Sequence, residues 1–220
     1  MTQLETELHL LKKEVINMWD LVRSQLVKAR SAMLNFDKDL AREVILKERR
    51  VNGSELKIDR DCENIFALLT PVAVDLRFVL AVLKINSNLE RIGDIAEGIA
   101  KYVLSIEIPF HRPLLEETLV IRMYDESVNI FEDALTAFEN EDTLLARSIF
   151  KKDEYLDDIN LRANDLIEKY LNSHPQDLNQ ALYILSVIRK LERVGDQSKN
   201  ISEEIIFYLE AKVLKHRHTH

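Results

Sequence analysis

Apolar residues recur at alternating intervals of three and four positions along most of the chain, which is the spacing of an amphipathic α-helix. Asn35 and Asp37, which are typical turn and helix-capping residues, end the first of these periodic segments. Within that segment the apolar positions are Leu11, Val15, Met18, Val22 and Leu26. The pattern therefore predicts a long first helix that buries one face.

Similar interruptions divide the rest of the chain into long helices. Proline is tolerated in a first helical turn, so Pro71 is expected to begin the third helix. The six expected helices cover about residues 3–33, the stretch that follows up to 69, 71–104, 114–138, 141–172 and 175–213. Helices of this length with short connections pack antiparallel, which predicts an all-α fold.

The hexapeptide Leu-Glu-Arg-Ile-Gly-Asp at 89–94 returns as Leu-Glu-Arg-Val-Gly-Asp at 191–196. Residues 18–57 also match 123–162 without a gap at a shift of 105, which falls to 102 at the hexapeptides. Ordered matches along both halves indicate an internal duplication. We therefore expect two tandem three-helix bundles: 1–105 and 114–215, with a linker at 106–113 and a His-rich tail at 216–220.

Composition indicates in which cellular compartment the protein works and which kinds of partner it is expected to bind. Only four glycines and four prolines are present, which fits long helices with few turns. A single cysteine, Cys62, suits a reducing compartment, and neither a signal peptide nor a membrane span is evident, so we expect a cytoplasmic protein. The net charge of −8 argues against nucleic-acid binding through a broadly basic surface.

Each hexapeptide places two carboxylates beside a glycine on one helix. Glu90 and Asp94 are four residues apart, and Gly93 shares their surface at the flank of an apolar seam. Glycine costs about 1 kcal/mol inside a helix and the like charges repel, so the motif combines two local penalties. Glu192, Gly195 and Asp196 repeat it. Paired carboxylates beside a cleared surface predict a cation site with oxygen ligands.

One helix supplies too few ligands, so neighbouring helices are expected to contribute. The middle helices carry pairs spaced four apart, and the first helices carry one acid each; Glu97 extends the first face, whereas its counterpart Lys199 does not. The additional candidate ligands are Glu48, Asn52, Asp153, Asp157, Asp20, Asp125 and Glu97.

Two other interpretations of these acids remain. Acids spaced four apart on a helix are usually a solvated face, which would leave a plain helical scaffold without metal. A helical carboxylate-bridged metalloenzyme is the other possibility, but such sites usually include Glu-x-x-His pairs, and no His follows a Glu by three within the six helices. Cys62 has no evident base either, so we expect a protein that is not an enzyme.

The doubled Glu-Arg-Ile/Val-Gly-Asp helix, together with Pro-Val-Ala-Val-Asp-Leu-Arg at 71–77, resembles the PhoU family of phosphate-transport accessory proteins. The resemblance implies a cytoplasmic all-α protein, commonly a homodimer, that holds multinuclear metal clusters through its Glu-x-x-x-Asp motifs. It places ligands at Glu90/Asp94, Glu192/Asp196, Glu48/Asn52 and Asp153/Asp157. Iron or zinc is expected, with manganese, magnesium or nickel as alternatives.

The resemblance also implies a function and partners. It implies a negative regulator of phosphate uptake and of the phosphate-starvation response, which links the ATPase subunit of a phosphate ABC transporter to a sensor histidine kinase. Membrane association would come only through these partners, and an accessory role beside another phosphate transporter is the alternative. The chain departs from the family pattern: Ile95 and Gln197 replace a frequent His, Gly98 replaces an Asn that Asn200 keeps, and Asn52 replaces an acid.

Overall fold

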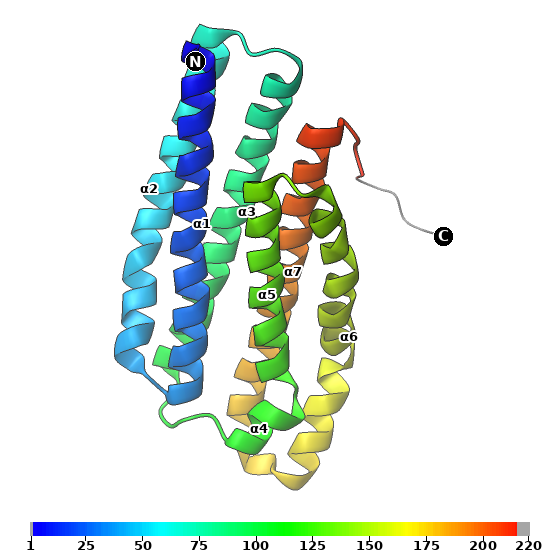
Figure 1. Cartoon of the computed structure of the whole chain (residues 1–220). Helices are drawn as coiled ribbons and strands as arrows, with labels where there is room; N and C mark the ends of the chain where they lie inside the picture. The colour runs from blue at the N-terminus through cyan, green and yellow to red at the C-terminus, as the bar shows by residue number, and fades with distance from the viewer. Residues whose placement is uncertain (1, 215–220) are drawn as a thin grey trace.

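The chain forms two bundles of long helices that lie side by side (Figure 1). The computed structural model describes residues 2–214. The first bundle contains α1 (Gln3–Asn35), α2 (Lys38–Leu69) and α3 (Ala73–Ser105). The second contains α5 (Val120–Asn140), α6 (Thr143–Ser173) and α7 (Leu178–Glu210), with the short α4 (Arg112–Glu117) before α5 and a 3-10 turn, η1 (Pro175–Asp177), before α7. The predicted all-α pair of three-helix bundles is confirmed.

The duplication extends to the conformation of the turns. Phe36 ends α1 at φ 54°, ψ 37°, and Glu141, 105 residues later, ends α5 at φ 56°, ψ 37°. Each is followed by an aspartate whose carboxylate accepts hydrogen bonds from the first backbone N–H groups of the next helix: Asp37 caps α2 and Asp142 caps α6. Equivalent residues thus start equivalent helices.

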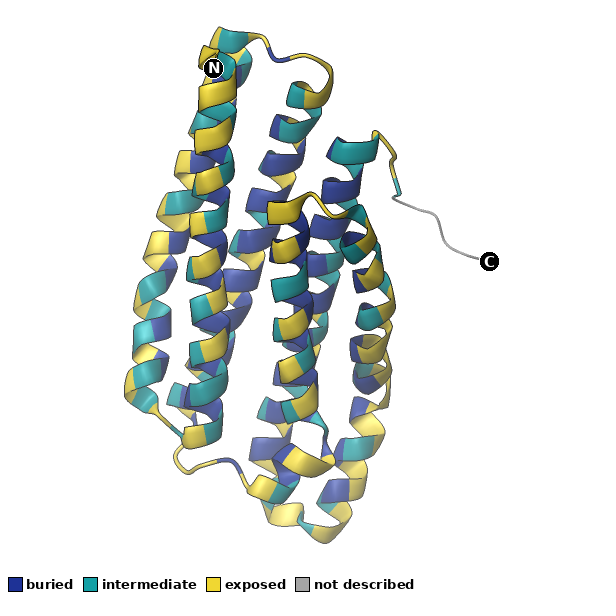
Figure 2. Ribbon diagram, viewed as in Figure 1, coloured by how far each residue is buried: buried dark blue, intermediate teal, exposed yellow. Residues whose placement is uncertain are grey.

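The motif helices α3 and α7 pack against each other at the centre of the molecule, and α1 also contacts α5 (Figure 1). Buried residues line the sides of the helices that face one another (Figure 2). Trp19 of α1 is fully buried, with its ring centroid 5.5 Å from Phe131 and 5.8 Å from Phe138 of α5. Tyr124, the counterpart of Trp19, donates a hydrogen bond to the carbonyl of Leu26 at 3.0 Å.

The start of the third helix differs from the prediction. Helix α3 begins at Ala73 rather than at Pro71. The chain leaves α2 through Thr70 in the left-handed region at φ 47°, and Val72 is extended. A residue that precedes a proline disfavours the α-helical conformation, and Thr70 precedes Pro71. Helix α2 therefore ends before Pro71, which lies in the connection to α3.

The single helix predicted at 114–138 is also wrong, because two helices occupy this region. Leu119 adopts φ 60°, ψ 10° and separates α4 from α5. The buried hydroxyl of Thr118 donates to the carbonyl of Leu114 at 2.6 Å and closes the end of α4. Helix α7 starts at 178 and ends at 210, within the predicted 175–213. The predicted tail at 216–220 lies outside the described residues.

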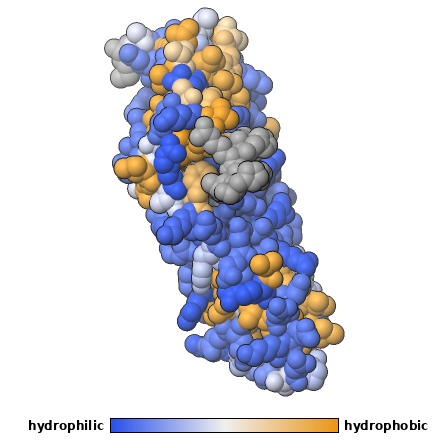
Figure 3. Space-filling model, turned by 90° about the vertical axis from the view of Figure 1, so that its right-hand side faces the viewer, coloured by the Kyte–Doolittle hydropathy of each residue, from blue (hydrophilic) through white to orange (hydrophobic). Residues whose placement is uncertain are grey.

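The surface carries both hydrophilic and hydrophobic side chains (Figure 3). The face in Figure 3 carries a mostly hydrophilic band between hydrophobic side chains that gather toward its two ends. Among residues 2–214, no helix combines the length and the apolar character that crossing a bilayer requires.

Candidate metal-binding clusters

The first acidic cluster forms where α2 and α3 meet at Gly93. A methyl group added to Gly93 would lie 3.2 Å from Glu48 Oε2 and 3.2 Å from Gln25 Oε1, so the missing side chain makes room for both. Glu48 is buried, and its Oε2 accepts a 2.7 Å hydrogen bond from Gln25 Nε2. Its other oxygen, Oε1, is buried without a hydrogen-bond partner.

Burial makes Glu48 an unusual carboxyl group. It raises the pKa of Glu48 to about 7, although the Gln25 hydrogen bond opposes the shift. The negative charges of Asp94, Glu97 and Glu90 raise it further. The predicted residues Glu48, Glu90, Asp94 and Glu97 therefore act on one another electrostatically, as the shared Gly93 surface predicted.

Glu55 joins the same cluster although the sequence did not single it out. Burial raises the pKa of Glu55, and the charges of Asp59 and Asp94 add to the effect. The pKa of Glu90 is raised by burial and then by Asp94 and Glu55. Glu55 lies seven residues, or two helical turns, after Glu48, so a search along the α2 face could have found it. No comparable indication existed in the sequence for Gln25, because this residue lies on α1 rather than on α2 or α3.

Three predicted ligands, all exposed, form no side-chain hydrogen bond or ion pair with either cluster within residues 2–214. The side chains of Asn52 and Asp20 form none at all there. Asp125 is exposed and pairs with Arg30 of α1 at 2.7 Å, so this ion pair links the two bundles. Of the first-helix side chains, it is Gln25 that reaches the first cluster.

The second cluster forms at Gly195, where α6 meets α7. Asp153 is buried against Gly195, and its Oδ2 accepts a hydrogen bond from the ammonium of Lys199. Lys199 also donates to Asp196 at 3.2 Å. Burial raises the pKa of Asp153, and the pKa of Glu192 is raised by burial and by Asp196, Asp157 and Asp153. All four predicted acids thus belong to this cluster.

Lys199 makes the two clusters different. It stands where Glu97 stands in the first repeat, and its ammonium lies between Asp153 and Asp196. Burial alone would lower the pKa of Lys199, but the hydrogen bonds and charges of Asp153 and Asp196 outweigh it, and the pKa rises. The second cluster therefore contains its own cation, whereas in the first cluster Lys101 pairs only with Glu97 at the edge.

The donor chemistry of the first cluster fits a hard cation. Its acids are oxygen donors, and the partnerless Glu48 Oε1 is a buried acceptor that a cation would satisfy. Asp153 Oδ1 is a similar acceptor in the second cluster, but Lys199 already neutralises that carboxylate. Within residues 2–214, no three His, Cys, Asp or Glu side chains lie close enough together to hold a metal ion as they stand.

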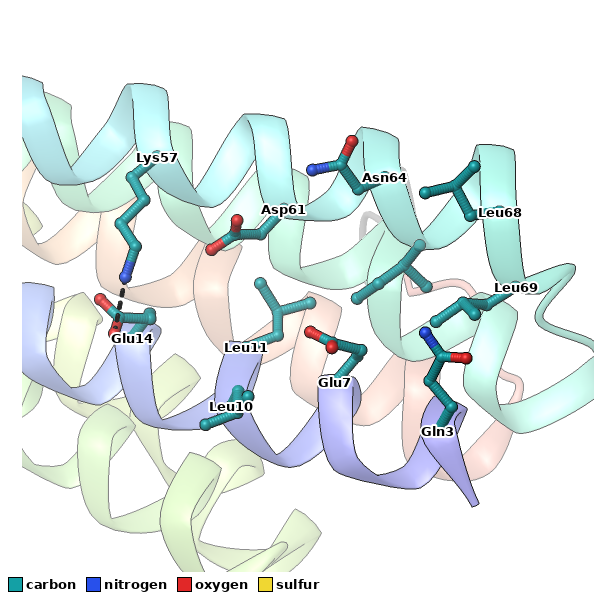
Figure 4. A pocket seen from close by; sticks show the side chains of 11 residues that line it. Gln3, Glu7, Leu10, Leu11, Glu14, Lys57, Asp61, Asn64, Leu68 and Leu69 are labelled. Atoms are coloured by element: carbon teal, nitrogen blue, oxygen red, sulfur yellow. Dashed lines mark ion pairs between the residues drawn. The ribbon is translucent and has the colours of Figure 1, made fainter.

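A separate hollow of about 520 Å³ lies between α1 and α2, near the start of α1 (Figure 4). Leucines form much of its lining, with Glu7, Glu14 and Asp61 among them, and Lys57 pairs with Glu14 at 2.7 Å. None of the predicted ligand residues lines this hollow. The acids at Gly93 and Gly195 remain the candidate site.

Replacing Gly195 with alanine is expected to lower the free energy of unfolding by about 1–2 kcal/mol, after the gain in helix propensity is included. The new methyl group would collide with Asp153 Oδ1 and would lie 2.7 Å from Leu156 Cδ1. Urea denaturation measures the effect. Gly53 is the matched control, because it is a helical glycine with no atom within 4 Å of an added methyl group. Gly53→Ala should stabilise, and equal effects of the two changes would contradict the packing argument.

Both repeats of this chain match known proteins. The family model described as PhoU domain matches residues 15–103 and 120–205. The chain is 34% identical to the phosphate-specific transport system accessory protein PhoU of Edwardsiella tarda, over 97% of this chain and 87% of that protein. It is 33% identical to the PhoU homolog of Aquifex aeolicus, over 96% of this chain and 95% of that protein.

Two solved structures of PhoU proteins have the same fold as this chain. The crystal structure of PhoU from Pseudomonas aeruginosa superposes with a TM-score of 0.88 at 30% identity, covering 96% of this chain and all of the other. The phosphate transport system regulatory protein PhoU from Streptococcus pneumoniae gives 0.86 at 30% identity, covering 96% and 99%. With two domain matches, near full-length relatives and the same fold, the chain belongs to the PhoU family, as the doubled hexapeptide predicted.

Proposed function

We propose that this protein is a cytoplasmic accessory protein of a phosphate transport system, and that it represses phosphate uptake and the phosphate-starvation response when phosphate is plentiful. The observation that carries the proposal is the near full-length match to relatives named phosphate-specific transport system accessory proteins. These relatives are named as accessory proteins rather than enzymes, which supports a regulatory rather than a catalytic role.

The proposed partners are the ATPase subunit of a phosphate ABC transporter and a phosphate sensor histidine kinase, bound by a homodimer. Exposed leucines on the outer helices are the first positions at which to test such contacts. Leu56 of α2 and Leu161 of α6 occupy equivalent positions in the two repeats and are 65% and 82% exposed. Single exposed apolar residues are common on protein surfaces, so the proposal of a transporter partner rests on the names of the relatives.

The acids around Gly93 are the proposed metal ligands, with iron or zinc as the expected ion and manganese, magnesium or nickel as alternatives. Glu48, Glu90 and Asp94 would supply most of the oxygen donors, and Glu97 would do so after releasing Lys101. The ion would relieve the mutual repulsion of these carboxylates, which raises the pKa of Glu48 and of Glu90 in addition to the effect of burial. The acids around Gly195 form a weaker site in this proposal, because Lys199 occupies part of it.

The test is complementation of a strain that lacks the gene, with a starvation-response reporter measured at high phosphate. The parent chain should restore repression. Elemental analysis of the same proteins, without residues 216–220, should find metal in the parent and at least a several-fold loss in Glu90→Gln/Asp94→Asn. The matched pair Glu192→Gln/Asp196→Asn should retain more metal.

The two readouts separate the parts of the proposal. Failure of the parent chain to repress the reporter would overturn the regulatory role. Repression without metal in any purified protein would retain the regulator and overturn the metal site. A greater metal loss from Glu192→Gln/Asp196→Asn would reverse the ranking of the two clusters.

A further inference from the structure

A groove of about 530 Å³ lies between the motif helices α3 and α7, at the junction of the two repeats. Both hexapeptides reach it through their arginines, Arg91 and Arg193. The other charged groups in its lining are Lys101, Lys190, Asp94 and Glu97. Four cations and two acids thus face one groove on a chain whose net charge is −8.

Three of these cations have no acid at contact distance, although the charges of Asp94 and Glu97 act on Lys190. Arg91, Lys190 and Arg193 form no ion pair within residues 2–214, whereas Lys101 is bonded to Glu97. Lys190 is held in place by its surroundings. Its ammonium lies 5.6 Å from the centre of the Tyr102 ring, and a methyl group on Gly98 would come within 2.6 Å of it. Unpaired cations around one hollow repel one another, and a bound anion would relieve that repulsion.

We propose that this groove binds inorganic phosphate, with Arg91, Lys190 and Arg193 donating hydrogen bonds to its oxygens. Guanidinium groups suit this role because their paired N–H groups match the spacing of phosphate oxygens. Asp94 lines the same groove and has no hydrogen-bond partner within the described residues. Phosphate at neutral pH keeps a P–OH group, and in the metal-free protein the carboxylate of Asp94 would accept a hydrogen bond from it.

The carboxylate gives the groove a basis for selectivity. Sulfate has the size and charge of phosphate but carries no proton at neutral pH, so Asp94 would repel it rather than accept a hydrogen bond. Asp94 is exposed, so solvent screens part of this repulsion. We therefore expect phosphate to bind more tightly than sulfate.

This inference extends the proposed function by giving the chain its own phosphate site, but it rests on the charges of the groove alone. Binding can therefore be tested without transporter, kinase or metal. If phosphate binds but the complementation test fails, only the regulatory proposal is lost. If repression is restored but phosphate does not bind, only the groove proposal is lost.

The experiment is isothermal titration calorimetry of the full chain, treated with chelator, with sodium phosphate as the probe. Phosphate should bind, and both Arg193→Gln and Lys190→Gln should weaken it about tenfold or more, which is the loss expected for a charge-assisted hydrogen bond. Arg60→Gln is the matched control: Arg60 is exposed on α2 and does not line the groove, so its replacement should leave the affinity unchanged.

Several outcomes would overturn the assignment: no binding at millimolar phosphate, equal weakening by Arg60→Gln, or sulfate binding as tightly as phosphate. A phosphate monoester such as glycerol phosphate distinguishes the source of the phosphoryl group. If the monoester binds tenfold more tightly than inorganic phosphate, the ligand is an organic phosphate and the assignment to free phosphate fails. Circular dichroism of each variant separates lost binding from lost folding.

Discussion

Replacing Lys199 with methionine is expected to lower the free energy of unfolding by about 3 kcal/mol near neutral pH, because it removes one partner of a buried ion pair. Asp153 has a side chain only 2% exposed and would keep its negative charge without the ammonium that now contacts it. Chemical denaturation measures the loss. The loss should shrink as the pH falls, because protonation of Asp153 removes the uncompensated charge.

The double variant Asp153→Asn/Lys199→Met tests the cause. An amide of the same shape as the carboxylate needs no counterion. Adding Asp153→Asn to Lys199→Met should therefore recover much of the stability that Lys199→Met removes. Additive losses in the two single variants would show that Lys199 stabilises α7 by some other contact. Lys152→Met is a suitable control, because Lys152 pairs with Asp133 at a more exposed site, where an ion pair contributes about 0–1 kcal/mol.

In metal-free protein, replacing Glu48 with glutamine is expected to raise the free energy of unfolding by about 3 kcal/mol above pH 8. The pKa of Glu48 rises from its ordinary 4.5 to about 7 on folding, chiefly because of burial. The folded state therefore favours the protonated carboxyl. Its contribution to stability is complete below pH 4.5 and is lost as the pH rises through 7. The glutamine removes that loss, so the two proteins should differ little at pH 4.

Urea denaturation over a series of pH values checks this expectation, and Glu43→Gln provides a control of opposite sign. Hydrogen bonds from Lys28 and Lys47 lower the pKa of Glu43, so its charged form favours the fold and its replacement should destabilise above pH 4.5. A Glu48→Gln variant that is less stable than the parent at high pH would contradict the buried, partnerless position of Glu48 Oε1. Bound metal should reduce the effect, because a cation favours the charged carboxylate.

Much of the fold could be predicted because its determinants are local. The apolar spacing defines the helices, and Asp37 shows where α2 begins because its carboxylate caps the helix that follows. The repeat then predicts the same cap at Asp142. The break at Leu119 could not be predicted in this way. No glycine or proline marks it, and Leu119 takes a left-handed conformation that a leucine rarely adopts.

The clusters could be predicted as far as their members follow one helix face. Glu90, Gly93 and Asp94 stand together for that reason, and the duplication then located Glu192, Gly195 and Asp196. The contact of Gln25 with Glu48 depends on how α1 packs beside α2, which no spacing along the chain encodes. Lys199 was visible as a departure from Glu97, but its position between Asp153 and Asp196 required the structure.

The central packing of α3 against α7 bears on how such a chain could evolve. One repeat alone would leave the outer face of its motif helix uncovered, and two identical copies could cover it by pairing around a two-fold axis. Joining the copies in one polypeptide replaces an encounter between molecules by one within a molecule, at a high effective concentration. It also allows the two halves to differ in sequence. A mutation in a symmetric pair appears twice, whereas in this chain Lys199 could arise in one half while Glu97 remained in the other.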